Sequence, residues 1–316
     1  LSYTTLASGD ETNFQVQPAG AYRGSPEVQH DIANSQFTLE LDSQARTWNN
    51  TALTGNWNTT DLNWVEGDNL FFNGDDVAFT DTAVGTVNLG TGLQPLSITL
   101  SNTSGNDYTF AGGSIIGTTG ISMNGGGALT LGGTNTYTGA ITVNAGVLNL
   151  GSTGALGATS GVTVASGARV NLNGQTPGGG GTTNPYSYTI AGDGGDGAGN
   201  LGAITNTGGA VYASSGIRSL TLSADAEVGG NNGRFDIGRH EGTGTYGTIT
   251  GGGFTLTKVG SSELCLRAPA SNITYVHESG TMWFEDYDTA SGTNAITVNG
   301  TAALGTYGTR SISNNV

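Results

Sequence analysis

The chain is short of charge, of cysteine and of long apolar runs, and each shortage excludes a class of protein. Charged residues make up 10% of the 316 residues, Lys258 is the only lysine, and the formal net charge is −15. Nucleic acids and anionic membranes bind surfaces rich in Lys and Arg, so we expect no nucleic-acid partner and no membrane insertion. No window approaches the roughly 18 consecutive apolar residues of a membrane-spanning helix.

The one cysteine, Cys265, can form no internal disulfide, which excludes a small domain held together by cystines. It stands in the alternating segment Leu264-Cys265-Leu266, where an inert strand residue is favoured over a reactive thiol. The N-terminus has neither a basic n-region nor an apolar h-region, so a signal peptide is absent or already removed. The missing initiator Met favours removal.

Glycine is what the chain has in excess, at 56 of 316 residues, against a usual share of roughly 7%. No Gly-X-Y period is present, which excludes collagen, and abundant Val, Ile, Leu and Thr with little charge argue against disorder. Glycine also interrupts every window that is long enough for a helix. The composition therefore indicates an all-β protein of many short strands joined by Gly and Asn turns.

One stretch, residues 129–151, sets the pattern for much of the chain. It holds three short alternations of apolar and polar residues, which is the period of a half-buried strand. The alternation at 141–143 returns at 162–164, and the sequence AITVN occurs at both 140–144 and 295–299. A period of about 20 residues is the signature of a solenoid. We predict a right-handed parallel β-helix (a β-solenoid) of about ten coils from residue 80 onward, with Leu, Ile and Val inside and Thr and Asn facing solvent or forming ladders at the turns.

A resemblance to a known family rests on the same segments. LTLGGTNTYTGAITVNAGVLNLG, followed by GALGATSGVTVASGARVNLNG, resembles the autotransporter-associated β-strand repeat. Residues 254–260 resemble the LTKxG lead-in to that repeat, and the Trp-rich residues 48–79 are similar to the section that precedes such repeats in large secreted bacterial proteins. The resemblance covers about residues 47–308 and implies a secreted or surface-displayed parallel β-helix. It brings no catalytic motif with it.

The chain divides into three expected parts. Residues 1–46 form an N-terminal extension that could act as an inter-subunit strand or arm, residues 47–83 form a Trp-rich cap, and residues 84–316 form the parallel β-helix repeats. For the cap, a capping core is favoured over an aromatic sugar-binding platform, because the terminal repeats of stacked folds are atypical. The tryptophans concerned are Trp48, Trp57 and Trp64.

Parallel β-helices include polysaccharide lyases and hydrolases, whose sites need clustered carboxylates. The acidic candidates, with the aromatic residues beside them, are Asp75-Asp76, Asp193 with Asp196, and Glu285-Asp286 with Asp288 next to Trp283, Phe284 and Tyr287. Turn chemistry is favoured for the first pair, and a solvated loop is favoured over Ca²⁺ or sugar binding for the last group. The three histidines, His30, His240 and His277, share no ligand spacing. We therefore assign no catalytic, cofactor-binding or metal-binding residue and expect no enzyme.

Other segments have weak similarity to binding motifs. Residues 191–200 resemble one irregular copy of a Ca²⁺-binding nonapeptide, and a flexible loop is favoured there. The glycine runs at 178–181 and 194–199 indicate excursions from the solenoid. The Thr-rich residues 134–138 would bind ice only if T-x-T units recurred in every coil. Such units are only scattered along the sequence, so we do not expect ice binding. We expect no cofactor, although the negative charge would allow weak Ca²⁺ binding.

These patterns predict a non-enzymatic structural protein, secreted or displayed at the surface of a bacterium, whose rod serves as a filament, sheath or adhesive stalk. The chain stops soon after residues 295–299 without a charged or proline-rich cap, so we expect either a piece of a longer solenoid or an end made to meet another molecule. The second option predicts a homo-oligomer that associates head to tail, with residues 1–46 as the strand-donating arm, and surface glycans are further candidate partners. The alternative is a carbohydrate-binding or polysaccharide-degrading β-helix protein that uses Trp283, Tyr287 and the acids near them.

Overall fold

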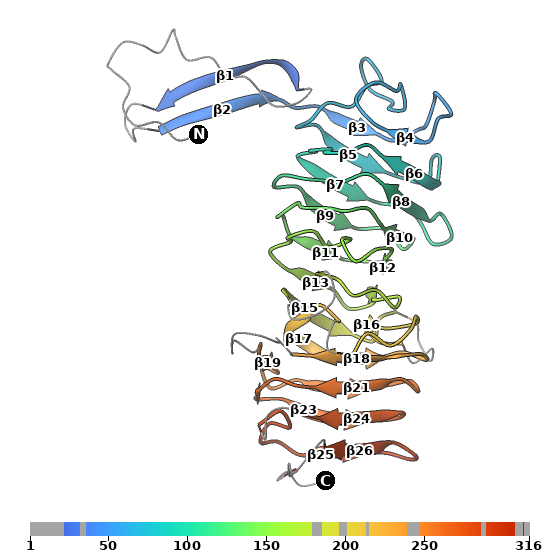
Figure 1. Cartoon of the computed structure of the whole chain (residues 1–316), viewed down its shortest axis with the longest axis vertical. Helices are drawn as coiled ribbons and strands as arrows, with labels where there is room; N and C mark the ends of the chain where they lie inside the picture. The colour runs from blue at the N-terminus through green and yellow to red at the C-terminus, as the bar shows by residue number, and fades with distance from the viewer. Residues whose placement is uncertain are drawn as a thin grey trace.

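The fold is a rod of stacked β-coils with a hairpin at one end (Figure 1). The computed structural model describes residues 22–31, 36–178, 185–195, 201–212, 215–238, 247–285, 289–306 and 312. All regular structure in these ranges is β-strand, as the composition predicted. The described residues accordingly contain no helix long and apolar enough to cross a membrane.

Three parallel ladders run along the rod, each built from strands of successive coils. The first consists of β3 (Ala45–Thr47), β5 (Asp76–Phe79), β7 (Ser97–Leu100), β9 (Gly120–Met123), β11 (Ile141–Val143), β13 (Val162–Val164), β15 (Tyr186–Gly192), β17 (Ile217–Gly229), β19 (Ile249–Thr250) and β22 (Ala270–Ser271). The second consists of β4 (Asn56–Trp57), β6 (Gly85–Leu89), β8 (Tyr108–Gly112), β10 (Ala128–Leu131), β12 (Val147–Leu150), β14 (Arg169–Asn171), β16 (Ile204–Thr205), the later part of β17, β20 (Thr255–Lys258), β23 (Thr274–His277) and β25 (Ile296–Val298). The third consists of β18 (Arg234–Ile237), β21 (Glu263–Leu266), β24 (Thr281–Phe284) and β26 (Ala303–Thr306).

The register of these ladders confirms the predicted parallel β-helix. Ile141 and Val162 are partners in the first ladder. One coil therefore runs from residue 141 to residue 162, as the repeat in the sequence predicted. Val162 and Tyr188 are partners one coil later, and the coil between them is several residues longer. The predicted glycine-rich excursion at 178–181 falls in this longer coil, and the one at 194–199 falls in the next coil, where Tyr188 pairs with Leu220. Most residues of both segments lie outside the described ranges.

The central repeat shows how sequence alternation becomes a core. In β10, β11 and β12 the Leu, Ile and Val side chains are mostly buried and the Thr and Asn side chains between them are partly exposed, because successive side chains of a strand point to opposite faces. At roughly 25 cal/mol per Å² of apolar surface removed from water, this repeated inward row is the main stabilising feature of the rod.

The Asn residues of this repeat were expected to face solvent or to form ladders at the turns, whereas the side chain of Asn135 bonds to backbone groups inside the rod. It is only 5% exposed, and Tyr137 beside it is fully buried. The Asn135 amide nitrogen donates to the carbonyl oxygens of Gly132 (2.9 Å) and Ala155 (3.0 Å), and its amide oxygen accepts from the Ile115 N–H (2.9 Å). One buried amide therefore ties three successive coils together, which an outward Asn could not do.

The Trp-rich segment fills the core of the first coils. Trp48, Trp57 and Trp64 are at most 1% exposed. Trp64 lies edge-on to both other rings, with centroids 5.3 Å from Trp48 and 5.5 Å from Trp57, a favourable aromatic geometry. Buried rings cannot stack on a sugar, so the platform interpretation of this segment is wrong.

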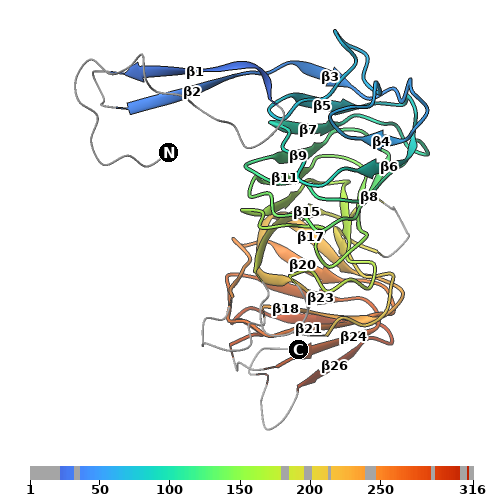
Figure 2. The ribbon, with the colours of Figure 1, turned by 45° about the horizontal axis from the view of Figure 1, so that its top comes forward.

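A hairpin leaves the N-terminal end of the rod sideways (Figures 1 and 2). Its strands β1 (Arg23–Asp31) and β2 (Gln36–Asp42) pair antiparallel. At its root, Arg23 forms ion pairs of 2.8 Å with Asp68 and Asp75, and its guanidinium lies 4.5 Å from the centre of the Phe72 ring. The remainder of the predicted extension, residues 1–21 and 32–35, lies outside the described residues.

Candidate functional site

The first acidic candidate, Asp75-Asp76, is structural. The Asp75 carboxylate is fully buried and accepts hydrogen bonds from the Arg23 guanidinium (2.8 Å) and from the N–H groups of Gln44 (3.0 Å) and Phe72 (2.9 Å). Asp76 belongs to β5 and accepts from the Ser97 hydroxyl of the next coil. The two neighbours therefore serve different contacts, and the Asp75 carboxylate is closed off from solvent, so this pair does not form an acid–base couple.

The second acidic candidate is described only in part. Asp193 accepts a hydrogen bond from the Gly195 N–H (2.9 Å), which is a local turn contact. Its proposed companion Asp196, and most of the nonapeptide-like segment, lie outside the described residues. The same holds for Asp286, Tyr287, Asp288 and His240, and for the side chain of His30.

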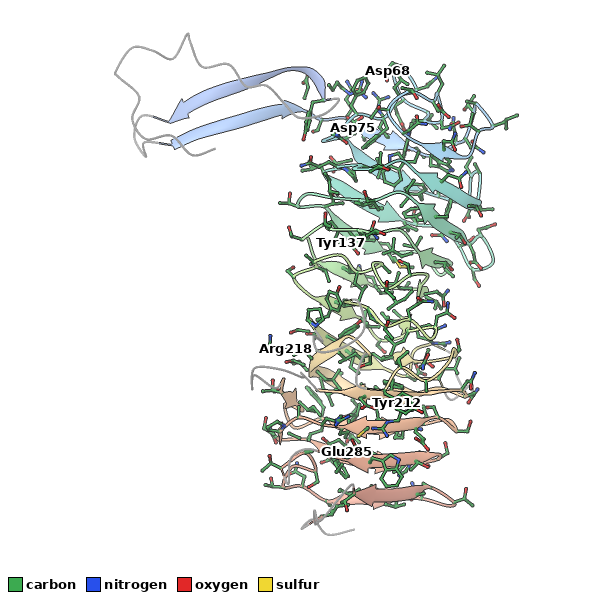
Figure 3. The ribbon with its side chains drawn as sticks, in the orientation of Figure 1. Asp68, Asp75, Tyr137, Tyr212, Arg218 and Glu285 are labelled. Atoms are coloured by element: carbon green, nitrogen blue, oxygen red, sulfur yellow. The ribbon has the colours of Figure 1, made fainter. Side chains whose placement is uncertain are left out.

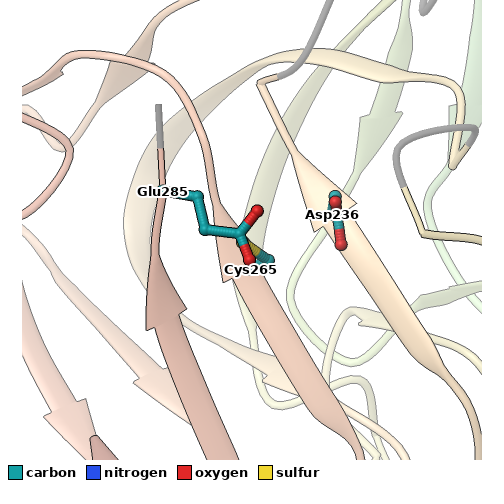
Figure 4. A group of neighbouring side chains, drawn as sticks. All are labelled: Asp236, Cys265 and Glu285. Carbon is teal, nitrogen blue, oxygen red and sulfur yellow. The ribbon is translucent and has the colours of Figure 1, made fainter. Parts of the chain in front are cut away.

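The third candidate, Glu285, leads to a cluster of ionisable side chains that the sequence did not reveal. Asp236 and Cys265 are register partners on the outward face of the third ladder, and Glu285 directly follows β24 of the next coil. One carboxylate oxygen of Asp236, the Sγ atom of Cys265 and one carboxylate oxygen of Glu285 lie within 4.8 Å of one another (Figure 4). All three residues are at most 5% exposed, although their side chains point away from the apolar interior.

Two arginines neutralise this cluster. Arg234 lies 2.7 Å from Asp236 and 3.1 Å from Glu285, and Arg267 lies 2.9 Å from Asp236 and 3.4 Å from Glu285. Two carboxylates facing two guanidiniums leave no net charge. A buried pair of this kind contributes little net stability, but removing one partner leaves an uncompensated charge and is strongly destabilising. The network therefore fixes three successive coils relative to one another.

The chemistry of the cluster does not fit a metal centre or a nucleophile. Burial raises the pKa of the Cys265 thiol far above its usual range, and the nearby carboxylates Asp236 and Glu285 raise it further. A raised pKa leaves little thiolate, which is the form of cysteine that acts as a nucleophile. Both carboxylates already form ion pairs with arginine, so a cation would have to displace those pairs to bind here. Burial alone would lower the pKa of Arg234, but its hydrogen bond with Asp236 and the charge of Glu285 hold it above its ordinary value, so both carboxylates keep a cationic partner.

Sequence reasoning missed this cluster for a definite reason. Asp236 and Cys265 meet only because their strands are register partners in successive coils, and Glu285 comes from one coil further on. Their only common sequence signal is a polar residue at an outward position of a short strand. That signal becomes informative once the register between coils is known.

A second buried polar site lies inside the rod, at the lysine of the LTKxG segment. Lys258 is 1% exposed, and its ammonium group donates to the carbonyl oxygens of Val259 (2.7 Å), Gly260 (2.8 Å) and Ser279 (3.1 Å). Burial lowers its pKa to about 8. The lysine therefore joins the turn of its own coil to the turn of the next one.

His277 is the register partner of Lys258 in that next coil, and it is fully buried. Its Nε2 lies 3.1 Å from the carbonyl oxygen of Ser279. Burial and the charge of Lys258 lower the pKa of the imidazole, which favours its neutral form. Among the described residues it belongs to no group of three candidate metal ligands, so we interpret His277 as part of the core.

Trp283, the aromatic residue proposed for sugar binding, packs on the next coil. A Cβ atom added at Gly305 would lie 2.4 Å from its indole ring, so the ring lies directly on the glycine backbone. Trp283 and Gly305 are register partners in the third ladder. The indole is only partly exposed, and the face that covers Gly305 is not available to a ligand.

Comparison with known proteins agrees with the repeat seen in the sequence. The family described as passenger-associated-transport-repeat matches residues 122–150, the coil around β10–β12. The chain is 30% identical over 249 residues to the adhesin BmaC autotransporter of Brucella suis biovar 1; the match covers 67% of this chain and 7% of that protein. No solved structure matches. The resemblance to the autotransporter passenger repeat is therefore confirmed, and the repeat forms one coil of a parallel β-helix.

Proposed function

We propose that this chain forms a non-enzymatic adhesive rod at a bacterial surface. The observation that carries the proposal is its 30% identity, along two thirds of its length, to a protein named as an autotransporter adhesin. The fold agrees with such a role, because a stack of coils presents a long lateral surface rather than one enclosed cavity. The chain spans about 7% of that relative, so its surface location is part of the proposal.

The side-chain chemistry of the described residues supports a non-enzymatic role. A glycosidase or lyase needs at least two carboxylates that face a substrate, and commonly one with a raised pKa. Here Asp75, Asp236 and Glu285 are buried and neutralised by arginine. Burial, together with Asp236 and Glu285, raises the pKa of the Cys265 thiol and disfavours the nucleophilic thiolate. These groups hold coils together, and no cofactor is required for that task.

Adhesion can be tested with beads that carry the folded chain. We expect such beads to remain on epithelial monolayers or on matrix-coated glass under flow, and beads that carry the heat-unfolded chain to be washed off. Circular dichroism of the same preparations would verify the folded and unfolded states. Equal retention of both bead types, or retention of neither, would overturn the adhesive proposal.

The head-to-tail association expected from the sequence is a separate part of this proposal. Among the described residues, the hairpin β1–β2 pairs only with itself, so its outer edges could add to a strand of another copy. The contact would join unlike surfaces and would extend into a filament unless its rotation closes a ring. Filaments in electron micrographs that disappear when residues 1–42 are deleted would support it. Monomeric rods that are unchanged by the deletion would refute it.

A further inference from the structure

A groove opens beside the third ladder, where the chain turns into strands β18 and β21. Its volume is about 370 Å³, and it spans segments of three successive coils. The residues that give it chemical character are Tyr212, Asn231, Asn232, Arg234, Ser262 and Glu263. Neither the acidic candidates found in the sequence nor the buried cluster around Cys265 accounts for this groove.

Tyr212 is the aromatic side chain of the groove, and Figure 3 labels it beside β18. It is 59% exposed, in contrast to the tryptophans of the cap. The Arg234 guanidinium lies 5.4 Å from the centre of its ring, which holds the ring in place by a cation–π contact. The backbone of Tyr212 has φ of 37°, a region that bulky residues rarely adopt.

Hydrogen-bonding groups surround the ring. Asn231, Asn232 and Glu263 are exposed, and their amides and carboxylate offer both donors and acceptors. The Asn232 amide already accepts from the Gly233 N–H (3.0 Å) and donates to the Thr207 carbonyl oxygen (3.4 Å), so it has only its remaining lone pairs and proton to offer. Ser262 lines the groove, is 4% exposed, and its hydroxyl has no hydrogen-bond partner among the described residues. This hydroxyl is closed off from solvent, so the polar contacts available to a ligand are those of the exposed side chains.

The charges of the groove disfavour an anionic ligand. Arg234 is the only cationic side chain of the lining, and it already holds the carboxylates of Asp236 and Glu285. Glu263 adds an exposed negative charge. A sulfate, phosphate or uronate group would therefore meet a carboxylate without gaining an uncommitted cation.

We propose that this groove binds a neutral oligosaccharide, with the exposed part of the Tyr212 ring stacked on the apolar face of a pyranose. Asn231, Asn232 and Glu263 would hydrogen-bond the ring hydroxyls, which act as donor and acceptor at once. The groove lies along the rod, so several sugar units of one chain could occupy it. The proposal rests on the adhesive function proposed above, and it names the class of ligand that one part of the surface recognises.

The test measures binding of the full chain to maltohexaose, cellohexaose and chitohexaose, with an oligogalacturonate of the same length as the anionic comparison. Titration calorimetry gives the affinity for each. We expect saturable binding of at least one neutral oligosaccharide, and an affinity lowered about tenfold or more in Tyr212→Ala, since the stacking surface is lost. Tyr212→Phe keeps the ring and should bind like the unmodified chain. Phe254→Ala removes an aromatic side chain that is 37% exposed outside the groove and serves as the matched control.

Each outcome decides the proposal. Loss of binding in Tyr212→Ala alone, with unchanged circular dichroism, supports the groove. Binding that survives Tyr212→Ala, binding only to oligogalacturonate, or no binding to any of the neutral oligosaccharides overturns it. Beads that adhere while no neutral oligosaccharide binds would refute this inference and leave the adhesive function standing. Oligosaccharide binding without bead adhesion would refute the adhesive function instead.

Discussion

The buried ammonium of Lys258 predicts an unusual rise of stability at alkaline pH. In the folded chain its pKa is lowered from 10.5 to about 8 by burial. Between these two values the unfolded chain holds a proton that the folded chain has released, so the free energy of unfolding increases with pH. Below about pH 8 both states are protonated and the penalty of burying the charge is fully present. Above about pH 10.5 both states are neutral and the penalty is gone.

The size of the effect follows from the same two values. The difference between a pKa of 10.5 and one of about 8 corresponds to about 3 kcal/mol in total. Buried tyrosines oppose it above pH 10, because burial raises the pKa of Tyr188 and Tyr275 well above 10, so the unfolded chain loses those protons first. Measurements should therefore stop at pH 9.5. By then we expect the Lys258 contribution to have raised the free energy of unfolding by about 2 kcal/mol relative to pH 7.

The assay compares urea unfolding of the unmodified chain and of Lys258→Met at several values between pH 7 and pH 9.5. Other titrating groups are present in both proteins and cancel in the difference, except His277, whose pKa Lys258 lowers further below its ordinary 6.5 and which therefore titrates below this pH range. Lys258→Met leaves the carbonyl oxygens of Val259 and Ser279 without the ammonium donor, which lowers its stability at every pH. Lys258→Gln, which keeps an amide donor, provides a second pH series if Lys258→Met does not fold.

Parallel plots of unfolding free energy against pH for the two proteins would contradict a lowered pKa of Lys258. If the difference between the unmodified chain and Lys258→Met stays constant within about 0.5 kcal/mol from pH 7 to pH 9.5, Lys258 does not release its proton in this range. A difference that changes in the opposite direction would show that the carbonyl oxygens stabilise the ammonium more than burial destabilises it. Either outcome would contradict a lowered pKa.

Three further substitutions test other contacts of the rod. Arg267→Met should lower the free energy of unfolding in urea by about 3–5 kcal/mol, because it leaves one buried carboxylate uncompensated. The control Arg218→Met, at a partly exposed arginine, should change it by less than about 0.5 kcal/mol. Equal effects of the two substitutions would contradict a buried network. Asn135→Ala should cost about 2–3 kcal/mol in thermal or urea unfolding, because the Ile115 N–H and the Gly132 carbonyl oxygen lose the amide, whereas the Ala155 carbonyl oxygen still accepts from the Tyr137 hydroxyl (3.0 Å). A loss below about 1 kcal/mol would mean that water replaces the amide. Gly305→Ala would place a Cβ atom 2.4 Å from the Trp283 ring. We therefore expect the free energy of unfolding to fall by about 1–3 kcal/mol and the tryptophan fluorescence emission to shift. Unchanged emission would show that the indole does not lie on the glycine.

Much of the fold could be predicted because its information is local. The alternation Ile141-Thr142-Val143 specifies one inward face by itself, since the side-chain period of a strand is two, and its return at 162–164 gives the length of a coil. The same reasoning assigned too little to Asn135 and Lys258. Asn was expected to face solvent or to form ladders at the turns, and no position was predicted for Lys258. Both side chains lie inside the rod, where backbone groups of neighbouring coils satisfy them.

The candidate sites could not be predicted in the same way. Trp283 could be read from the sequence as a sugar-binding platform, yet the outcome depends on Gly305 one coil later. The groove around Tyr212 combines residues of three coils. Among the acidic candidates, turn chemistry was favoured for Asp75-Asp76, and Asp75 does accept from the Phe72 N–H, but its ion pair with Arg23 had no signal in the sequence.

The sequence alone determined the all-β class, the repeat, the parallel stack and which Leu, Ile and Val residues line it. Only the tertiary structure decided which outward and polar residues meet, such as Asp236 with Cys265 or Lys258 with the carbonyl oxygen of Ser279. The physical reason is that the alternation within a strand depends on immediate neighbours in the chain, whereas side-by-side contacts depend on the length of each coil. That length varies along the rod, since Val162 pairs with Ile141 of the preceding coil and with the more distant Tyr188 of the following one.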